Sequence, residues 1–206
     1  SGLVSNEMLA GQHIKHQALQ TDKEENSLSI LSWNIKMHPP PYGWFYNSID
    51  RAENIIKTMK ESSKYDVILF QEAFSYKIRN KIYNSLKDLY PHQIDIKDET
   101  NFYTMNSGLW VISSIPITLI DNINFTELRH NDWLSSKGAY LYSVIKSQQE
   151  FYIINTHMQA DYLTKYSDIR TSQYAEIHQK LILPNENSEI PLILCGDLNI
   201  SKPSKL

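Results

Sequence analysis

The tetrapeptide Gly196-Asp197-Leu198-Asn199 follows an apolar run over residues 190–195. Such a run is typical of a buried strand. A loop that begins where this strand ends could aim the Asp and the Asn at one phosphate and one metal ion. Taken alone, the same pair also fits an Asx turn, in which the Asp side chain bonds the backbone two residues on. Polar residues elsewhere in the chain have to decide between these two interpretations.

Four other places combine an apolar run with polar side chains at one of its ends. The first expected strand ends in Asn34, the second ends in Glu72, and a later strand ends in the segment 155–159, which contains His157. Lys137 directly precedes another apolar run. If these strands lie side by side, their ends converge on one rim of the fold. That rim would carry carboxylates, amides, a lysine and a histidine.

This set of side chains suits the cleavage of a phosphate ester with a hard cation. Mg²⁺ prefers oxygen ligands and keeps water and substrate oxygens in its coordination shell. His157 and Lys137 can donate hydrogen bonds to phosphate oxygens as negative charge builds up in the transition state. Glu72 is the best candidate ligand for the ion. Further oxygens come from Asn34, Asp197 and Asn199.

Other types of site find less support. The chain has one cysteine and no histidine pair with the spacing of zinc ligands. It also lacks a G-x-S-x-G elbow, a P-loop and a G-x-G-x-x-G motif. The joint occurrence of polar side chains at five strand ends favours a site, although each residue taken singly has an ordinary structural interpretation. These are a turn for Asn34, a charge at a helix N-terminus for Glu72, a turn for Lys137 and a structural histidine for His157.

The composition fits one substantial domain, with 206 residues of which 41% are hydrophobic. No apolar window approaches the length of a membrane-spanning helix, and the N-terminus shows no signal-peptide pattern. A secreted protein or effector and a cytosolic protein both fit the sequence. The net charge of -3 makes nucleic acid a less favoured partner, because that affinity depends on neutralising phosphates. Cys195 is the single cysteine, so an intrachain disulfide is excluded.

The elements that position these residues follow from hydrophobic periodicity. Residues 1–27 are polar and are expected to be a flexible lead-in to one domain over residues 28–206. Buried strands that alternate with amphipathic helices predict packed sheets covered by helices. One helix carries Ile49, Ala52, Ile55, Ile56 and Met59, a second carries Phe74, Ile78, Ile82, Leu86 and Leu89, and a third runs over 168–183 with Tyr174, Ile177, His178 and Leu181 on its apolar face. Strands are predicted over 28–33, 67–70, 109–112, 117–123, 139–145, 151–155 and 192–195.

On these motifs the chain resembles the endonuclease/exonuclease/phosphatase superfamily. This DNase I-like group includes nucleases, inositol polyphosphate phosphatases and neutral sphingomyelinases. Within it, the likeness to bacterial sphingomyelinase C is greatest, and it runs from about Leu28 to the end of the chain. The segments that carry the resemblance are 31–35, 67–74, 136–140, 155–161, 169–173 and 196–199.

The resemblance implies an α/β fold, namely a four-layer α-β-β-α sandwich that is open at its C-terminal edge. It implies Mg²⁺-dependent hydrolysis of a phosphodiester by an in-line water, with Mn²⁺ or Co²⁺ as substitutes in vitro. The implied substrate is sphingomyelin at a membrane surface, which is cut to ceramide and phosphocholine. Carried over by position, Glu72 and Asn34 hold the metal, Asp197 and Asn199 position the water, the scissile phosphate or a second ion, His157 donates to the phosphoryl oxygens, and Lys137 and Gln159 contact substrate.

Two features depart from the family's pattern. The family's catalytic domain closes with further strands and a Ser-Asp-His-type motif whose histidine is the general base, and this sequence contains no such motif. We therefore expect a C-terminally shortened version of the domain that lacks a base typically contributing about 10²–10⁴ in rate. In the proline-rich segment 38–46, which cannot form a helix, Tyr42, Trp44 and Phe45 either meet a membrane interface or fold back on the core.

Three functions fit the sequence. The leading hypothesis is a sphingomyelinase-like phosphodiesterase that acts on a membrane phospholipid. A DNase-like endonuclease would use the same metal site, although the net charge disfavours it. The third hypothesis, motivated by the missing base, is a catalytically inactive protein that keeps the fold in order to bind lipid or a partner.

Overall fold

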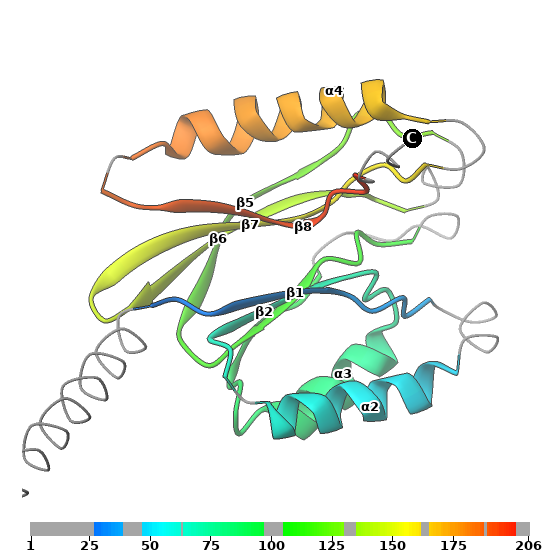
Figure 1. Cartoon of the computed structure of the whole chain (residues 1–206), viewed down its shortest axis with the longest axis vertical. Coiled ribbons are helices and arrows are strands. Elements are labelled where there is room, and N and C mark those ends of the chain that lie inside the picture. The colour runs from blue at the N-terminus through cyan, green and yellow to red at the C-terminus, as the bar shows by residue number, and fades with distance from the viewer. Residues whose placement is uncertain are drawn as a thin grey trace, which may run out of the picture.

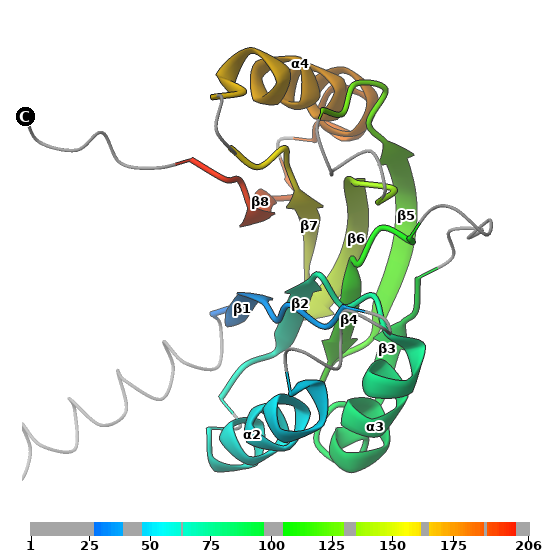
Figure 2. The same cartoon turned by 90° about the vertical axis from the view of Figure 1, so that its right-hand side faces the viewer.

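Two facing β-sheets with helices on their outer sides form the body of the protein (Figures 1 and 2). The structure is a computed structural model that describes residues 27–38, 47–62, 64–96, 105–129, 135–161, 165–187 and 189–200. Helices α2 (Ser48–Glu61) and α3 (Tyr76–Leu86) cover one sheet, and α4 (Ser167–Ile177) covers the other. The predicted α/β class and four-layer sandwich are therefore confirmed.

The first sheet has the strand order β1-β2-β4-β3, formed by β1 (Ile30–Asn34), β2 (Val67–Gln71), β4 (Trp110–Ser113) and β3 (His92–Ile94). β1 and β2 are parallel, whereas β4 is antiparallel to both of its neighbours. Every residue of β2 is buried, as its continuous apolar run predicts. The short β3 was not predicted from the sequence.

The second sheet has the order β5-β6-β7-β8, formed by β5 (Ile117–Asn124), β6 (Gly138–Lys146), β7 (Gln149–His157) and β8 (Leu192–Asp197). β7 and β8 are parallel and place His157 opposite Asp197. Both strands extend beyond their predicted ends at 155 and 195. These extensions carry two predicted site residues on adjacent strands instead of leaving them in loops.

The helices follow the predicted positions, but α4 differs in its buried face. The α-helical part of α4 ends at Ile177, and a π-helical turn over His178–Ile182 continues it. Tyr174, expected on the apolar face, is 48% exposed, and the polar Gln173 is fully buried in its place. Ile49 and Leu89 are likewise exposed. Periodicity therefore located the helices but placed too many residues in their apolar faces.

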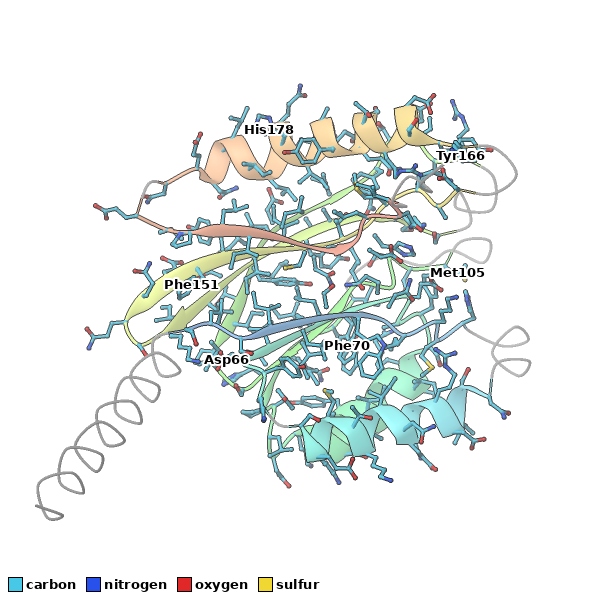
Figure 3. All side chains as sticks on the ribbon, in the orientation of Figure 1. Asp66, Phe70, Met105, Phe151, Tyr166 and His178 are labelled. Atoms are coloured by element: carbon cyan, nitrogen blue, oxygen red, sulfur yellow. The ribbon has the colours of Figure 1, made fainter. Side chains whose placement is uncertain are left out.

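Three apolar clusters separate the four layers, and alternate residues of one strand enter different clusters. Val67 and Leu69 of β2 pack between the two sheets, whereas Ile68 and Phe70 pack toward α2 and α3. Figure 3 labels Phe70 in that outer layer, where its ring stacks on Trp110 with centroids 4.8 Å apart. Because β2 is buried on both faces, its orientation is fixed, and with it the position of the residues at its end.

Some sequence predictions fall outside the part of the chain that the structure describes. These are the flexible lead-in, of which residues 1–26 lie outside, and the aromatic residues Tyr42, Trp44 and Phe45. The division into a lead-in and a domain over 28–206 stays a prediction. Among helices within the described ranges, none combines the length and apolar character that crossing a membrane requires.

Candidate active site

Four of the predicted site residues meet at one end of the sandwich. Asn34 ends β1, Glu72 follows β2, His157 ends β7 and Asp197 ends β8. The Nδ2 atom of Asn34 donates to Glu72 Oε1 at 2.7 Å and to Asp197 Oδ2 at 2.9 Å. His157 Nε2 lies 4.0 Å from the same Glu72 oxygen and 3.8 Å from the same Asp197 oxygen. A single amide therefore joins carboxylates from the two sheets, with an imidazole beside both.

The backbone of Glu72 adopts the left-handed conformation, with φ of 54°. This conformation is uncommon for a residue other than glycine and costs about 1–3 kcal/mol, so the surrounding structure has to impose it. The carbonyl of Glu72 accepts the amide of Met37 at 2.8 Å, and the next amide, that of Ala73, donates to Gly108 at 2.9 Å. Strain at this residue supports a functional role for its carboxylate.

His38 is a site residue that the sequence did not single out. Its Nε2 atom lies 3.2 Å from Glu72 Oε2, and its ring stacks on Phe74 with centroids 5.6 Å apart. Burial raises the pKa of Glu72, but the hydrogen bonds from His38 and Asn34 and the nearby charge of His157 outweigh it and lower the pKa to about 2. Glu72 is therefore ionised at neutral pH.

The carbonyl of Met158 organises the second sheet's side of the site. Buried Lys137 donates to it from Nζ at 2.9 Å and also lies 3.3 Å from His157 Nε2. Asn199 donates to the same carbonyl from Nδ2 at 2.9 Å. The amide of Asn199 donates to Asp197 Oδ1 at 3.0 Å, which is the Asx turn considered above. The Asx turn and the convergence on the site therefore occur together.

The structure places Gln159, which is predicted to contact substrate, in a buried position behind His157. Its side chain is fully buried, and its Oε1 atom accepts the amide of Arg129 at 2.8 Å. Its Nε2 atom donates to the carbonyls of Arg129 at 3.1 Å and Ala160 at 3.0 Å. Because its amide group bonds backbone at Arg129 and Ala160, Gln159 holds the segment behind His157 in place. Its contact with substrate stays a prediction.

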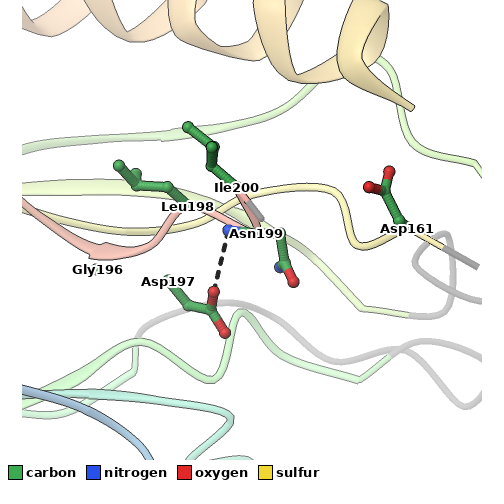
Figure 4. Close-up of a pocket in the computed structure, with 6 residues that line it drawn as sticks. All are labelled: Asp161, Gly196, Asp197, Leu198, Asn199 and Ile200. Carbon is green, nitrogen blue, oxygen red and sulfur yellow. Dashed lines mark hydrogen bonds between the residues drawn. The ribbon is translucent and has the colours of Figure 1, made fainter. Parts of the chain in front are cut away.

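A hollow of about 550 Å³ adjoins Asp197 and Asn199 (Figure 4). Asp161 lies across this hollow from them and pairs with Arg170, with Nη1 to Oδ1 at 2.7 Å and Nη2 to Oδ2 at 3.2 Å. The hydrogen bonds from Arg170 lower the pKa of Asp161. Asp161 therefore adds a second carboxylate to the wall of the hollow, which the segment 196–200 also lines.

The donor set fits a hard divalent cation better than zinc. Within the described part of the chain, no group of three or more His, Cys, Asp and Glu side chains is arranged to hold an ion unaided. Glu72 and Asp197 nevertheless approach one another closely enough to share the Asn34 amide. An ion here would need amide, water and substrate oxygens to complete its shell, which is how Mg²⁺ is usually bound.

Comparison with known proteins identifies the family. The model described as the Endonuclease/Exonuclease/phosphatase family matches residues 31–205. This chain belongs to that family. The predicted superfamily is thus confirmed.

Bacterial sphingomyelinases are among the similar proteins. Sphingomyelinase C of Listeria ivanovii is 27% identical over 206 residues, covering 91% of this chain and 60% of that protein. Sphingomyelinase C 2 of Leptospira interrogans is 27% identical over 196 residues, covering 86% of this chain and 31% of that protein. The chain therefore spans less than two thirds of these relatives. A Staphylococcus aureus beta toxin variant with bound magnesium ions shares the fold, with a TM-score of 0.77 and 22% identity over 87% of this chain and 67% of that chain.

Proposed function

We propose that this chain is a Mg²⁺-dependent phosphodiesterase that hydrolyses sphingomyelin or a related phospholipid to ceramide and phosphocholine at a membrane surface. The observation that carries the proposal is the Asn34 amide, which bridges Glu72 and Asp197 with His157 within 4.0 Å of both carboxylates. The relatives named sphingomyelinase C support the choice of substrate. The magnesium ions in the beta toxin structure support the choice of metal.

The residues of this chain would divide the work between binding the ion and binding the phosphate. Glu72, Asn34 and Asp197 would hold the ion, with Asn199 beside them. When bound, the ion neutralises charge on the phosphoryl oxygens and lowers the pKa of a bound water. Mn²⁺ or Co²⁺ would replace Mg²⁺ in vitro, since both accept oxygen ligands.

His157 and Lys137 would stabilise the phosphoryl group as charge develops on it. Lys137 Nζ bonds the Met158 carbonyl and lies 3.3 Å from His157 Nε2, so it holds the imidazole in place and adds a positive charge. In the reaction, a water oxygen bonds to phosphorus and the bond from phosphorus to the ceramide oxygen breaks. The water loses a proton and the ceramide oxygen gains one. Asp197, on the strand next to His157, would orient that water.

The test is phosphocholine release from sphingomyelin vesicles by the purified chain in Mg²⁺, in Mg²⁺ with EDTA, and by the Glu72→Gln variant. We expect release in Mg²⁺ alone. The absence of Mg²⁺-dependent phosphocholine release would contradict the proposal. Plasmid nicking that requires Mg²⁺ and is lost in Glu72→Gln, without phosphocholine release, would instead favour an endonuclease.

A further inference from the structure

The two residues after Glu72 are held by a buried arginine from the helix layer. Arg79 of α3 is 5% exposed and donates from Nη1 to the carbonyls of Ala73 at 2.7 Å and Phe74 at 3.0 Å. Its Nε atom donates to Asp95 Oδ1 at 2.7 Å. One guanidinium therefore fixes two successive carbonyls next to the strained residue and is itself anchored by a carboxylate.

The opposite side of the same segment is held by a loop that precedes β4. Asn106 Nδ2 donates to the Phe74 carbonyl at 3.1 Å, and Asn106 Oδ1 accepts the Gly108 amide at 2.9 Å. Gly108 has φ of 69°, and a Cβ atom there would lie 2.8 Å from the Phe74 ring and 3.0 Å from the Glu72 Cα atom. The Glu72 backbone is thus confined between this close glycine contact and the arginine.

Arginines of the other two outer helices, α2 and α4, also bind backbone carbonyls near predicted site residues. Arg51 of α2 donates to the carbonyl of Ile35 at 2.8 Å, directly after Asn34. Arg170 of α4 donates to the carbonyl of Gln159 at 3.0 Å, just beyond His157. Arginines from α2, α3 and α4 therefore bind carbonyls one or two residues beyond three predicted site residues. Arg79 is the case in which the adjacent site residue also has a left-handed backbone.

We infer that Arg79 is a positioning residue, which holds the left-handed backbone of Glu72 and thereby aims its carboxylate at the metal position. The inference rests on the proposed function in assigning the metal to Glu72. The rigid fork of a guanidinium serves two carbonyls and the Asp95 carboxylate at once, whereas a lysine ammonium on a flexible stem cannot reproduce that geometry. Groups bonded directly to metal ligands typically alter metal affinity about 10–100-fold when they are replaced. Arg79 acts on Glu72 through the carbonyls of the next two residues, so we expect the lower end of that range.

The test measures Mn²⁺ binding by the loss of the free-ion EPR signal, which requires no turnover. We expect Arg79→Lys to weaken Mn²⁺ binding about tenfold and Asp95→Asn to weaken it less. The matched control is Lys146→Ala. Lys146 also donates to a backbone carbonyl, that of Ser27 at 2.7 Å, and pairs with Asp66 at 2.7 Å, at the opposite end of β2. This control should lose stability and keep wild-type Mn²⁺ affinity.

The outcomes separate this inference from the proposed function. Folded Arg79→Lys and Asp95→Asn variants with wild-type Mn²⁺ affinity would overturn the inference, as would an equal loss in Lys146→Ala. In a Glu72→Gln background, the Arg79→Lys substitution should have no further effect on Mn²⁺ affinity. If the wild-type chain binds no Mn²⁺, the proposed function is wrong. Hydrogen exchange at the Ala73 amide then tests the positioning role separately. Faster exchange in Arg79→Lys would support that role, and unchanged exchange would overturn it.

Discussion

The two ends of the sandwich both carry a polar bridge between the sheets, but the charges of the two bridges differ. Asp66, labelled in Figure 3, lies at the end where β2 begins. Its Oδ2 atom accepts Lys146 Nζ at 2.7 Å and the Ser29 amide at 2.7 Å, so one negative charge meets one positive charge. At the end where β2 finishes, two carboxylates, Glu72 and Asp197, share the neutral amide of Asn34. The first bridge is suited to fastening the sheets, and the second to receiving a cation.

The imidazoles at the second bridge sharpen this contrast. His38 and His157 both lie within 4.0 Å of Glu72, whereas a lysine, Lys146, pairs with Asp66 at the other bridge. A bound divalent ion would add positive charge beside Glu72 and Asp197. We therefore expect changes at the two ends to separate stability from activity.

The largest expected effect is the loss of activity in Glu72→Gln. Glutamine keeps the size of the side chain but removes the charge that a metal ligand provides, and a metal contributes several kcal/mol to such a reaction. Phosphocholine release should fall at least about 100-fold. A folded Glu72→Gln variant with near wild-type turnover would mean that the acidic bridge is not the metal site.

Acid should lower the stability that Glu72 contributes to its end of the sandwich. The pKa of Glu72 is lowered from 4.5 to about 2 in the folded chain, so its contribution to stability is present above pH 4.5 and is lost as the pH falls toward 2. The size of the shift corresponds to about 3 kcal/mol. Urea titrations in EDTA at pH 5 and pH 3 should show this loss, and Glu72→Gln should show a smaller one. Equal acid sensitivity of the two proteins would contradict the prediction.

At the opposite end, Lys146→Ala should lower stability without lowering kcat. The pair with Asp66 is mostly buried, since the side chains are 20% and 15% exposed. We expect a loss of about 2 kcal/mol in the free energy of unfolding, between the values for surface and buried pairs. Thermal unfolding measures the loss, and phosphocholine release measures kcat. A loss of kcat at a temperature where the variant is folded would show that the two ends are coupled.

The sequence predicted some of the strands and site residues at these two ends and missed others. Apolar runs located β2, β7 and β8, and the polar residues at their ends did converge with Asn34 on one rim. β3 was missed because a three-residue strand with a polar centre has no alternation long enough to detect. His38 was missed because it is the first residue of the proline-rich segment 38–46. Its contact partner, Glu72, is also distant from it in the sequence.

The burial of Gln159 also depends on contacts that the local sequence does not show. A glutamine directly after a site strand looks available for substrate, and composition cannot tell whether its amide will bond backbone instead. Here the neighbouring segment at Arg129 binds both polar atoms of the side chain. The buried Gln173 on α4 is the complementary case, in which a polar residue replaces the expected apolar Tyr174. In both, tertiary hydrogen bonds outweighed the local pattern.

Gln173→Leu should have the smallest effect on stability and still affect the site. Gln173 Oε1 accepts the amide of Gln159 at 2.9 Å, and its Nε2 atom donates to the carbonyl of Glu127 at 3.0 Å. Leucine fills similar volume but leaves both backbone groups unbonded, which should cost about 1–2 kcal/mol. Because Gln159 lies two residues beyond His157, turnover should fall severalfold while Mn²⁺ affinity at Glu72 stays unchanged. Lys146→Ala, with a similar or larger loss of stability and unchanged turnover, is the control. If the two variants lose turnover equally, the end that carries Glu72 is no more sensitive than the end that carries Lys146, and the two ends do not differ in function.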